Sequence, residues 1–100
     1  MAHYAAAKAA VISFTKTLAV ETAASGVRAN ALVPGWIETD LTDFIRHDEA
    51  FEGSLLASVP MGRWGTAEEI AEGATFLAGD ASSFMTGQVL VLDGGLTAGV

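Results

Sequence analysis

The sequence predicts an α/β fold with two parallel strands in a single domain spanning residues 1–100. A long alanine-rich segment precedes a short apolar run, and a second apolar run near the carboxyl end follows a capped helical segment. Helices that alternate with fully apolar strands are typical of a parallel sheet covered on its faces. We expect strands at about 27–33 and 88–92, and helices at about 2–24, 40–57 (irregular) and 67–78.

The first helix is predicted from composition and spacing. Residues 2–24 contain neither Gly nor Pro, and Ala7, Val11, Phe14 and Leu18 recur at intervals of three and four. Ser25-Gly26 follows, and a glycine can adopt the left-handed conformation that closes a helix. The apolar run 27–33, stopped by Pro34-Gly35, then predicts a strand covered on both faces.

The carboxyl-terminal half contains a second helix–strand pair. Residues 36–59 mix acidic and apolar residues at weak helical spacing, which favours one or two short helices resembling a lid. Thr66 and Glu69 form a capping-box pattern that starts the helix 67–78. The run Gln88-Val-Leu-Val-Leu92 predicts the second buried strand, which ends at Asp93-Gly-Gly95.

Composition excludes several classes of protein. The net charge is −7 and no basic stripe is present, which disfavours nucleic acid and anionic membranes as partners. The chain has no cysteine, so thiol catalysis and thiolate metal sites are excluded, and we expect no metal and a cytoplasmic location. Because 51% of so short a chain is apolar, we expect part of its surface to be covered by another copy, as in a homo-oligomer.

Tyr4 and Lys8 are the candidate catalytic pair. Four residues apart on a helix, their side chains emerge from one face about a turn apart. A neighbouring ammonium favours the phenolate and lowers the pKa of a tyrosine, which then serves as general acid or base. The alternative is a tyrosine packed beside a solvated lysine, since this spacing occurs often by chance. His3, beside Tyr4, is interpreted as a solvated residue.

The order of motifs resembles the carboxyl-terminal part of a short-chain dehydrogenase/reductase. The motif Tyr4-Ala-Ala-Ala-Lys8 is similar to the active-site helix of that family, and Val33-Pro-Gly-Trp-Ile-Glu-Thr39 to the segment that touches the nicotinamide. Residues 62–71 resemble its next loop and helix, and residues 86–95 its last strand. The resemblance implies a doubly wound Rossmann-type fold, of which this chain would be the carboxyl-terminal fragment.

The resemblance also implies roles for individual residues. Tyr4 would donate a proton to the substrate carbonyl, and Lys8 would lower the pKa of Tyr4 and bind the ribose of NAD or NADP. The cofactor would further be contacted by four residues of the turn after the first strand, while Trp36 would face the substrate. The four are Pro34, Gly35, Ile37 and Thr39. Two alternatives stay open, that Thr39 caps the following helix and that Trp36 is a core aromatic.

Ahead of Tyr4 the sequence holds neither the glycine-rich turn that cradles the pyrophosphate in this family nor its active-site serine. We therefore expect a fragment of an NAD(P)-dependent alcohol or carbonyl oxidoreductase that is inactive alone and possesses half of the cofactor site or binds none. The alternatives are a non-catalytic, self-associating module and a remnant of a longer enzyme. The substrate and the choice between NAD and NADP depend on residues outside these motifs.

Overall fold

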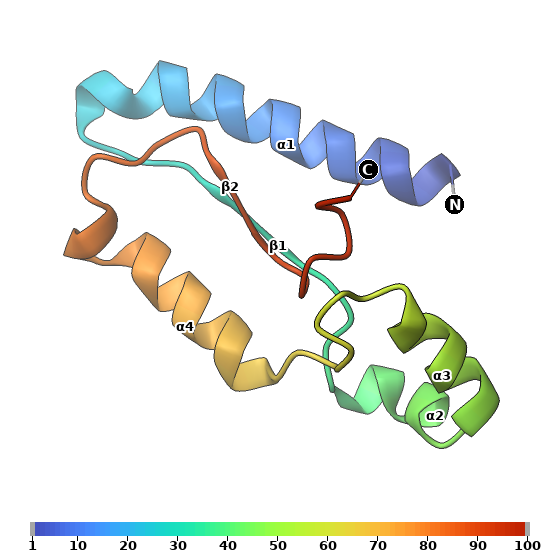
Figure 1. Ribbon diagram of the computed structural model, residues 1–100. Helices are drawn as coiled ribbons and strands as arrows, with labels where there is room; N and C mark the ends of the chain where they lie inside the picture. The colour runs from blue at the N-terminus through green and yellow to red at the C-terminus, as the bar shows by residue number, and fades with distance from the viewer. Residues whose placement is uncertain (1, 100) are drawn as a thin grey trace. The chain divides into compact units, whose positions relative to one another are not determined.

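The computed structural model describes residues 2–99, except the side chain of Tyr4, and confirms the predicted α/β fold. Helix α1 is followed by a short 3-10 turn and strand β1, then by three helices and strand β2 (Figure 1). The bounds are α1 Ala2–Thr22, η1 Ala23–Ser25, β1 Ala31–Pro34, η2 Asp40–Thr42, α2 Asp43–Arg46, α3 Glu49–Ala57, α4 Ala67–Ala78, η3 Asp80–Ser82 and β2 Val89–Leu92.

The two strands pair in parallel. The Ala31 N–H donates to the carbonyl of Gln88 at 2.9 Å, and the Gly35 N–H donates to the carbonyl of Leu92 at 2.9 Å. Both partners advance by four residues, as they do in a parallel ladder. Strand β2 matches the predicted strand 88–92 to within one residue, and α4 matches the predicted helix 67–78.

The prediction of a strand over 27–33 was wrong at its start, because β1 begins only at Ala31. In the preceding residues, side-chain hydrogen bonds accompany one backbone bond, in which the Gly87 N–H donates to the Ala29 carbonyl at 2.7 Å. The Ala29 N–H donates to Thr86 Oγ1 (3.1 Å), and Asn30 both donates from Nδ2 to the Met85 carbonyl (3.0 Å) and accepts from the Gln88 N–H (3.0 Å). At Asn30 itself the side-chain amide, with one donor and one acceptor in use, pairs with the backbone of the opposite segment.

The chain divides into two compact units, and each is described by itself. The first comprises residues 1–32 and 75–90, and the second residues 33–74 and 91–100. In the first unit, the second half of α1 lies beside the loop that leads into β2 (Figure 1). Lys16 Nζ donates to the carbonyl of Gly87 at 3.1 Å, and Ala19 packs against Gly87, where an added Cβ would lie 3.4 Å from the Ala19 Cβ.

Helix α1 buries a different side from the one its apolar spacing marks. Val11 and Phe14 are 59% and 67% exposed, whereas Thr15 and Ala19 are buried. The buried Thr15 hydroxyl has a hydrogen-bond partner within the helix, since it donates to the Val11 carbonyl at 2.7 Å. Small residues on both sides of an alanine-rich helix give a weak amphipathic pattern, so the packing partner decides which side is inside.

Arg28 fastens the carboxyl end of α4 to the turn that follows it. Its Nη2 donates to the carbonyls of Leu77 (3.0 Å) and Gly79 (3.3 Å), and its Nη1 donates to the Met85 carbonyl (3.1 Å) and the Ser82 hydroxyl (3.2 Å). Ser82 is itself 3% exposed. A guanidinium is suited to this position because it offers several donors in a planar fork, and a helix carboxyl end carries partial negative charge.

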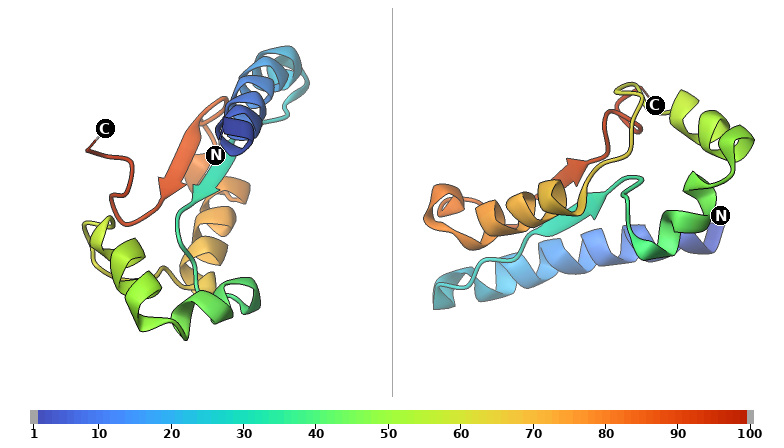
Figure 2. Two further views of the ribbon diagram at one scale, coloured as in Figure 1. Left: turned by 90° about the vertical axis from the view of Figure 1, so that its right-hand side faces the viewer. Right: turned by 90° about the horizontal axis from the view of Figure 1, so that it is seen from below.

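The second unit contains the predicted irregular segment 40–57, which is confirmed as short helices. Helices α2 and α3 lie next to each other (Figure 2), and Asp48 caps α3 by accepting from the Phe51 N–H at 3.2 Å. The buried apolar side chains of this unit are Val33, Ile45, Val59 and Trp64. The carboxyl-terminal Gly94–Gly95 turn lies against it, because the Met61 N–H donates to the Gly94 carbonyl at 3.1 Å.

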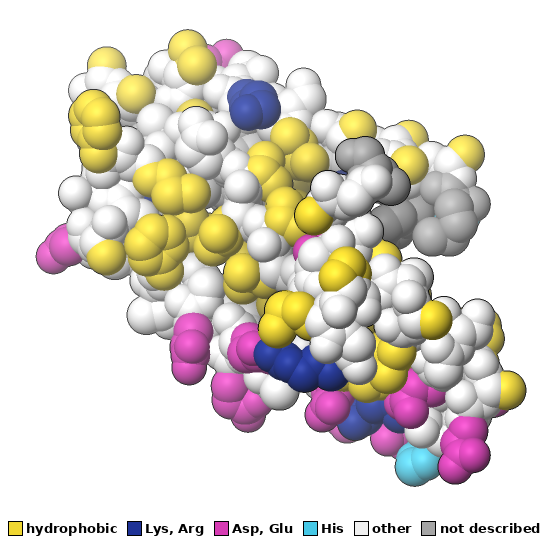
Figure 3. Space-filling model, viewed as in Figure 1, with side chains coloured by type: hydrophobic (Ala, Val, Ile, Leu, Met, Phe, Trp, Pro, Cys, Tyr) yellow, Lys and Arg dark blue, Asp and Glu magenta, His cyan; other side chains and the backbone are white. Residues whose placement is uncertain are grey.

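Charge is distributed unequally between the units. The second unit holds ten carboxylates and two arginines, a net charge of −8, while the first has a net charge of +1. On the face drawn in Figure 3, acidic side chains gather over α4 and the α2–α3 segment. Among residues 2–99, none of the helices is both long and apolar enough to cross a membrane.

Candidate active site

Tyr4 and Lys8, the predicted catalytic pair, both lie on α1 in the first unit. The helix extends from Ala2, so the two residues are one turn apart on one face, as expected from their spacing. The Lys8 side chain is half-buried, and His3 is exposed. The orientation of the Tyr4 side chain falls outside the described part of the chain, so its catalytic role stays a prediction.

The turn after β1 is built around Gly35 in the second unit. A Cβ on Gly35 would lie 2.7 Å from both Cα and Cβ of Asp93, closer than any real side chain tolerates. A glycine at the end of a strand can let the backbone approach a ligand closely. The structure adds a cause from within the chain, since Gly35 is needed for the close approach of Asp93 directly after β2.

Ile37 continues the strand direction beyond this turn. It forms a parallel bridge with Gly65, in which the Gly65 N–H donates to the Trp36 carbonyl and the Glu38 N–H to the Gly65 carbonyl, both at 2.9 Å. In such a bridge the backbone groups of the central residue point to the other side. The Ile37 carbonyl accepts from the Thr42 hydroxyl at 2.8 Å, and no hydrogen bond among the described residues uses the Ile37 N–H.

Thr39 occupies the cap position of the 3-10 turn η2, where its backbone rather than its hydroxyl makes the hydrogen bonds. Its N–H donates to Thr42 Oγ1 at 3.0 Å, and its carbonyl accepts from the Thr42 N–H at 3.1 Å. The residue is exposed, as is Pro34. These bonds use the backbone of Thr39 and leave its hydroxyl available, so contact between Thr39 and a cofactor stays a prediction.

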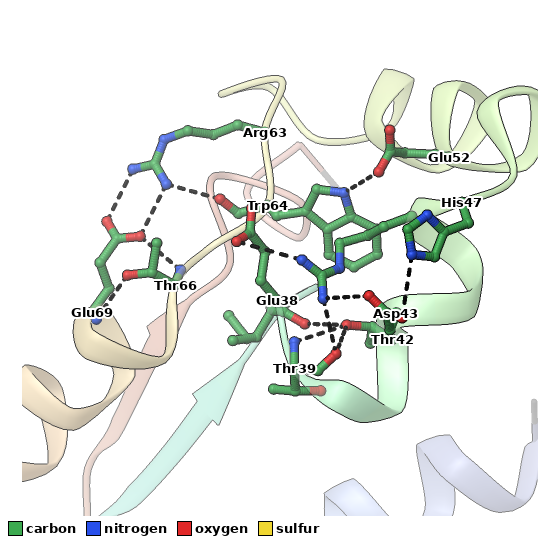
Figure 4. Close-up of polar contacts among 12 residues, drawn as sticks. Glu38, Thr39, Thr42, Asp43, His47, Glu52, Arg63, Trp64, Thr66 and Glu69 are labelled. Atoms are coloured by element: carbon green, nitrogen blue, oxygen red, sulfur yellow. Dashed lines mark hydrogen bonds and ion pairs between the residues drawn. The ribbon is translucent and has the colours of Figure 1, made fainter.

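Arg46 holds the same segment from α2. Its Nη2 donates to the Thr39 carbonyl at 3.3 Å and to Asp43 Oδ1 at 3.2 Å, and its Nη1 lies 3.7 Å from Glu38 Oε2 (Figure 4). Residues 38–43 are thus fixed from both ends, by Arg46 and by the bridge to Gly65. A segment fixed in this way is preorganised, so a ligand would bind it without a large ordering cost.

The two tryptophans of the chain pack against each other in the second unit. Their ring centroids are 6.4 Å apart at an interplanar angle of 81°, an edge-to-face arrangement. Trp64 is 6% exposed and its Nε1–H donates to Glu52 Oε2 on α3 at 2.8 Å (Figure 4), while Trp36 is 38% exposed. Trp36 is therefore neither a fully buried core residue nor a free surface side chain.

Arg63 and Glu69 form the shortest ion pair among the described residues, at 2.9 Å. The guanidinium donates to both carboxylate oxygens at 2.9 Å, and Glu69 also accepts from the Thr66 N–H at 2.9 Å (Figure 4). The Thr66 hydroxyl accepts from the Glu69 N–H at 3.1 Å, which completes the predicted capping box. The hydrogen bond from Arg63, followed by that from Thr66, lowers the pKa of Glu69 to about 2.

Two contacts around the candidate site gave no recognisable signal in the sequence. The Glu52–Trp64 hydrogen bond joins residues 12 apart in the chain, and Arg46 reaches back seven residues to Thr39. Neither spacing is a motif. Within residues 2–99 no cluster of three His, Asp or Glu side chains is arranged to hold a metal ion.

Comparison with known proteins assigns the chain to a family. A family model described as enoyl-(acyl carrier protein) reductase matches residues 1–97. Together with the α/β fold and the Tyr4-x-x-x-Lys8 helix, this match shows that the chain belongs to the short-chain dehydrogenase/reductase family. The family resemblance seen in the sequence is therefore confirmed.

The chain is similar both to curated protein sequences and to solved structures. The chain is 53% identical over 95 residues to the 3-oxoacyl-[acyl-carrier-protein] reductase FabG of Chlamydia pneumoniae, a match that covers 95% of this chain and 38% of that protein. Among solved structures it is similar to a gluconate 5-dehydrogenase from Burkholderia cenocepacia J2315 in complex with NADP and tartrate. That similarity has a TM-score of 0.88 at 45% identity and covers 97% of this chain and 38% of the other.

A second solved structure fits nearly the whole chain. It is a 4-hydroxyisoleucine dehydrogenase complexed with NADH, with a TM-score of 0.94 and 34% identity, covering 99% of this chain and 41% of the other. The chain thus spans about two fifths of the length of the relatives it matches.

Proposed function

We propose that this chain provides the proton-transfer helix and the nicotinamide-side turn of an NAD(P)-dependent oxidoreductase that interconverts an alcohol and a carbonyl. The observation that carries the proposal is the family match over residues 1–97, which includes Tyr4 and Lys8 one turn apart on α1. The similar gluconate 5-dehydrogenase is in complex with NADP, and the 4-hydroxyisoleucine dehydrogenase with NADH. The names of those two relatives refer to different compounds, so the proposal specifies the substrate only as an alcohol or a carbonyl compound.

In this proposal the side chains of α1 move the proton. The Tyr4 hydroxyl donates it to the substrate oxygen during reduction and takes it back during oxidation. The Lys8 ammonium favours the phenolate that remains, and it offers donors to the ribose of the cofactor. When bound, the nicotinamide supplies or accepts the hydride.

The turn after β1 has features that fit such a cofactor. Pro34 and Thr39 are exposed, and the Ile37 N–H is a backbone donor that no described residue uses. We infer that Pro34, Gly35 and Ile37 would line the nicotinamide and that Thr39 would serve the neighbouring phosphate. A backbone N–H that no described residue uses, beside an exposed turn, is free to donate to the carboxamide oxygen of a nicotinamide.

The pyrophosphate cradle and the serine partner of the family have no counterpart ahead of Tyr4 in these 100 residues. Hydride transfer depends on holding two reactants in a near-attack geometry. We therefore propose that the chain alone does not turn over, and that activity requires a protein as long as its relatives, of which it spans about two fifths.

A second proposal concerns assembly. Val11 and Phe14 on α1 are more than half exposed, and so is Phe84, which makes no buried contact at 104% exposure. Apolar side chains in this number favour self-association. We propose a homo-oligomer without nucleic acid or membrane partners, cytoplasmic in location. A non-catalytic, self-associating module is the alternative function, and it too would be an oligomer.

The test is a calorimetric titration of the purified chain with NADH and with NADPH, followed by an absorbance assay of reduced-cofactor oxidation with a panel of ketones. The same measurements are made on Tyr4→Phe and Lys8→Met, with Lys16→Met as a control that lies outside the proposed site. A protein with the relatives' full length that carries residues 1–100 is the positive reference.

We expect weak or no cofactor binding by the chain alone, and turnover by the full-length protein that Tyr4→Phe abolishes while Lys16→Met leaves it intact. Lys8→Met should weaken both binding and turnover. If Tyr4→Phe in the full-length protein kept its activity, the assignment of the proton donor would be wrong. If no full-length form oxidised either cofactor, the non-catalytic alternative would hold.

A further inference from the structure

Trp64 is a buried side chain whose orientation is selected by one polar contact. It is 6% exposed, and a buried indole needs a partner for its Nε1–H because that donor would otherwise lose its hydrogen bond to water. The partner is Glu52 Oε2 at 2.8 Å, a short, charge-assisted hydrogen bond. Rotating the ring about its side-chain bonds would move the Nε1–H away from that carboxylate, so Glu52 selects one orientation.

Glu52 is itself held in place by the start of α3. Its N–H donates to the Asp48 carbonyl at 2.8 Å, and Asp48 caps the helix through the Phe51 N–H at 3.2 Å. The carboxylate therefore has a fixed origin on a helix of nine residues. Because the backbone of Glu52 is already ordered, only its side-chain torsions have to be fixed when the hydrogen bond to Trp64 forms.

Trp64 in turn supports Trp36. The two rings meet edge to face at 6.4 Å, and Trp36 is 38% exposed. Trp36 directly follows Pro34-Gly35 and its carbonyl accepts the Gly65 N–H, so its backbone is fixed while its ring has one open side. Trp64 supplies a contact that limits how the Trp36 ring turns.

We propose that Glu52 is a positioning residue that acts through Trp64 to set the orientation of the exposed Trp36 ring. The acidic helix α3 thereby shapes the wall that a substrate would meet beside the nicotinamide-side turn. This last step rests on the proposed function. The coupling from Glu52 to Trp64 to Trp36 belongs to the second unit alone and is independent of cofactor binding.

The test uses NMR of the 100-residue chain, with the two indole Nε1–H signals as probes. Glu52→Met removes the acceptor at similar length, Glu52→Gln keeps an acceptor oxygen, and Glu49→Met changes an exposed acid in the first turn of the same helix. The readouts are the exchange rate of the Trp64 Nε1–H and the cross-peaks between the two indole rings.

We expect Glu52→Met to speed exchange of the Trp64 Nε1–H by ~10-fold or more and to remove the cross-peaks with Trp36, since a bond to a charged group is lost. Glu52→Gln should retain both features, and Glu49→Met should leave them unchanged. Unaltered exchange and cross-peaks in Glu52→Met would overturn the proposal, as would their loss in Glu49→Met.

Trp64→Phe is the second variant, in case Glu52→Met unfolds the second unit. It keeps an aromatic ring but removes the donor, so the Trp36 ring signals should change as they do in Glu52→Met. Trp36 signals that match the wild type in Trp64→Phe would overturn the coupling. Failure of the cofactor titration with these NMR results intact would instead count against the proposed function and leave the coupling standing.

Discussion

Replacing Arg28 by methionine tests how much the Arg28 hydrogen bonds contribute to the stability of the first unit. The change keeps most of the aliphatic stem and removes four hydrogen bonds, with donor–acceptor distances of 3.0–3.3 Å, to three carbonyls and the Ser82 hydroxyl. Two of those carbonyls, from Leu77 and Gly79, lie at the end of α4, where a cation also interacts with the helix dipole.

The magnitude follows from the number and burial of these contacts. A hydrogen bond to a charged group contributes ~1.5–3 kcal/mol when buried, and these are partly buried and share two nitrogens. Some of the carbonyls would regain water. We therefore expect Arg28→Met to lower the free energy of unfolding by about 2–4 kcal/mol, a large part of the ~5–15 kcal/mol typical of a domain.

Urea unfolding followed by far-ultraviolet circular dichroism measures the effect. With a denaturant slope of ~1–1.5 kcal/mol/M for a chain of this size, the midpoint should fall by roughly 2 M. Lys16→Met is the matched control, because Lys16 makes a single exposed bond to the Gly87 carbonyl at 3.1 Å and should cost no more than ~1 kcal/mol. Equal midpoints for Arg28→Met and Lys16→Met would refute the reasoning.

Two further predictions concern the second unit. Gly35→Ala should lower the free energy of unfolding by ~1–3 kcal/mol, because the new Cβ would lie 2.7 Å from Asp93. Gly53→Ala should raise the free energy of unfolding by ~0.5–1 kcal/mol, because Gly53 lies in α3 with open space around it. Thermal melts in which both midpoints moved in the same direction would contradict this. Glu69 has a folded pKa of about 2, below its unfolded value, so its contribution is present above about pH 4.5 and is lost as the pH falls toward 2. Unfolding measured from pH 7 to pH 2 should therefore show the advantage of the wild type over Glu69→Gln shrinking across that window, and an advantage independent of pH would show that the Arg63 pair is not responsible.

The parts of the fold that could be predicted from the sequence depend on local chemistry. Thr66 and Glu69 are three residues apart and cap α4 by themselves, so its start was evident. The delayed start of β1 was not, because Asn30 is paired with Met85, 55 residues away. Likewise, the alanine-rich composition of α1 gives no strong preference for one side, and only its contact with residues near Gly87 decides that Ala19 is buried.

The candidate site divides in the same way. Tyr4 and Lys8 were found because a spacing of four is meaningful on any helix, and the turn from Pro34 to Thr39 because it ends a strand. The supporting contact from Glu52 to Trp64 has no such regularity, since it depends on how α3 meets the loop that precedes α4. Contacts of this kind are set by tertiary packing and not by any local pattern of residues.

The parallel pairing of β1 with β2 also has a consequence for how fast the chain folds. The strands have four residues each and are separated by the 54 residues from 35 to 88, so no tight turn brings them together. Closing a loop of that length costs about 3.5 kcal/mol of chain entropy beyond a constant term, before the few hydrogen bonds of the ladder can form. We expect folding on the millisecond-to-second scale, limited by the search for this pairing rather than by the formation of α1 or α4.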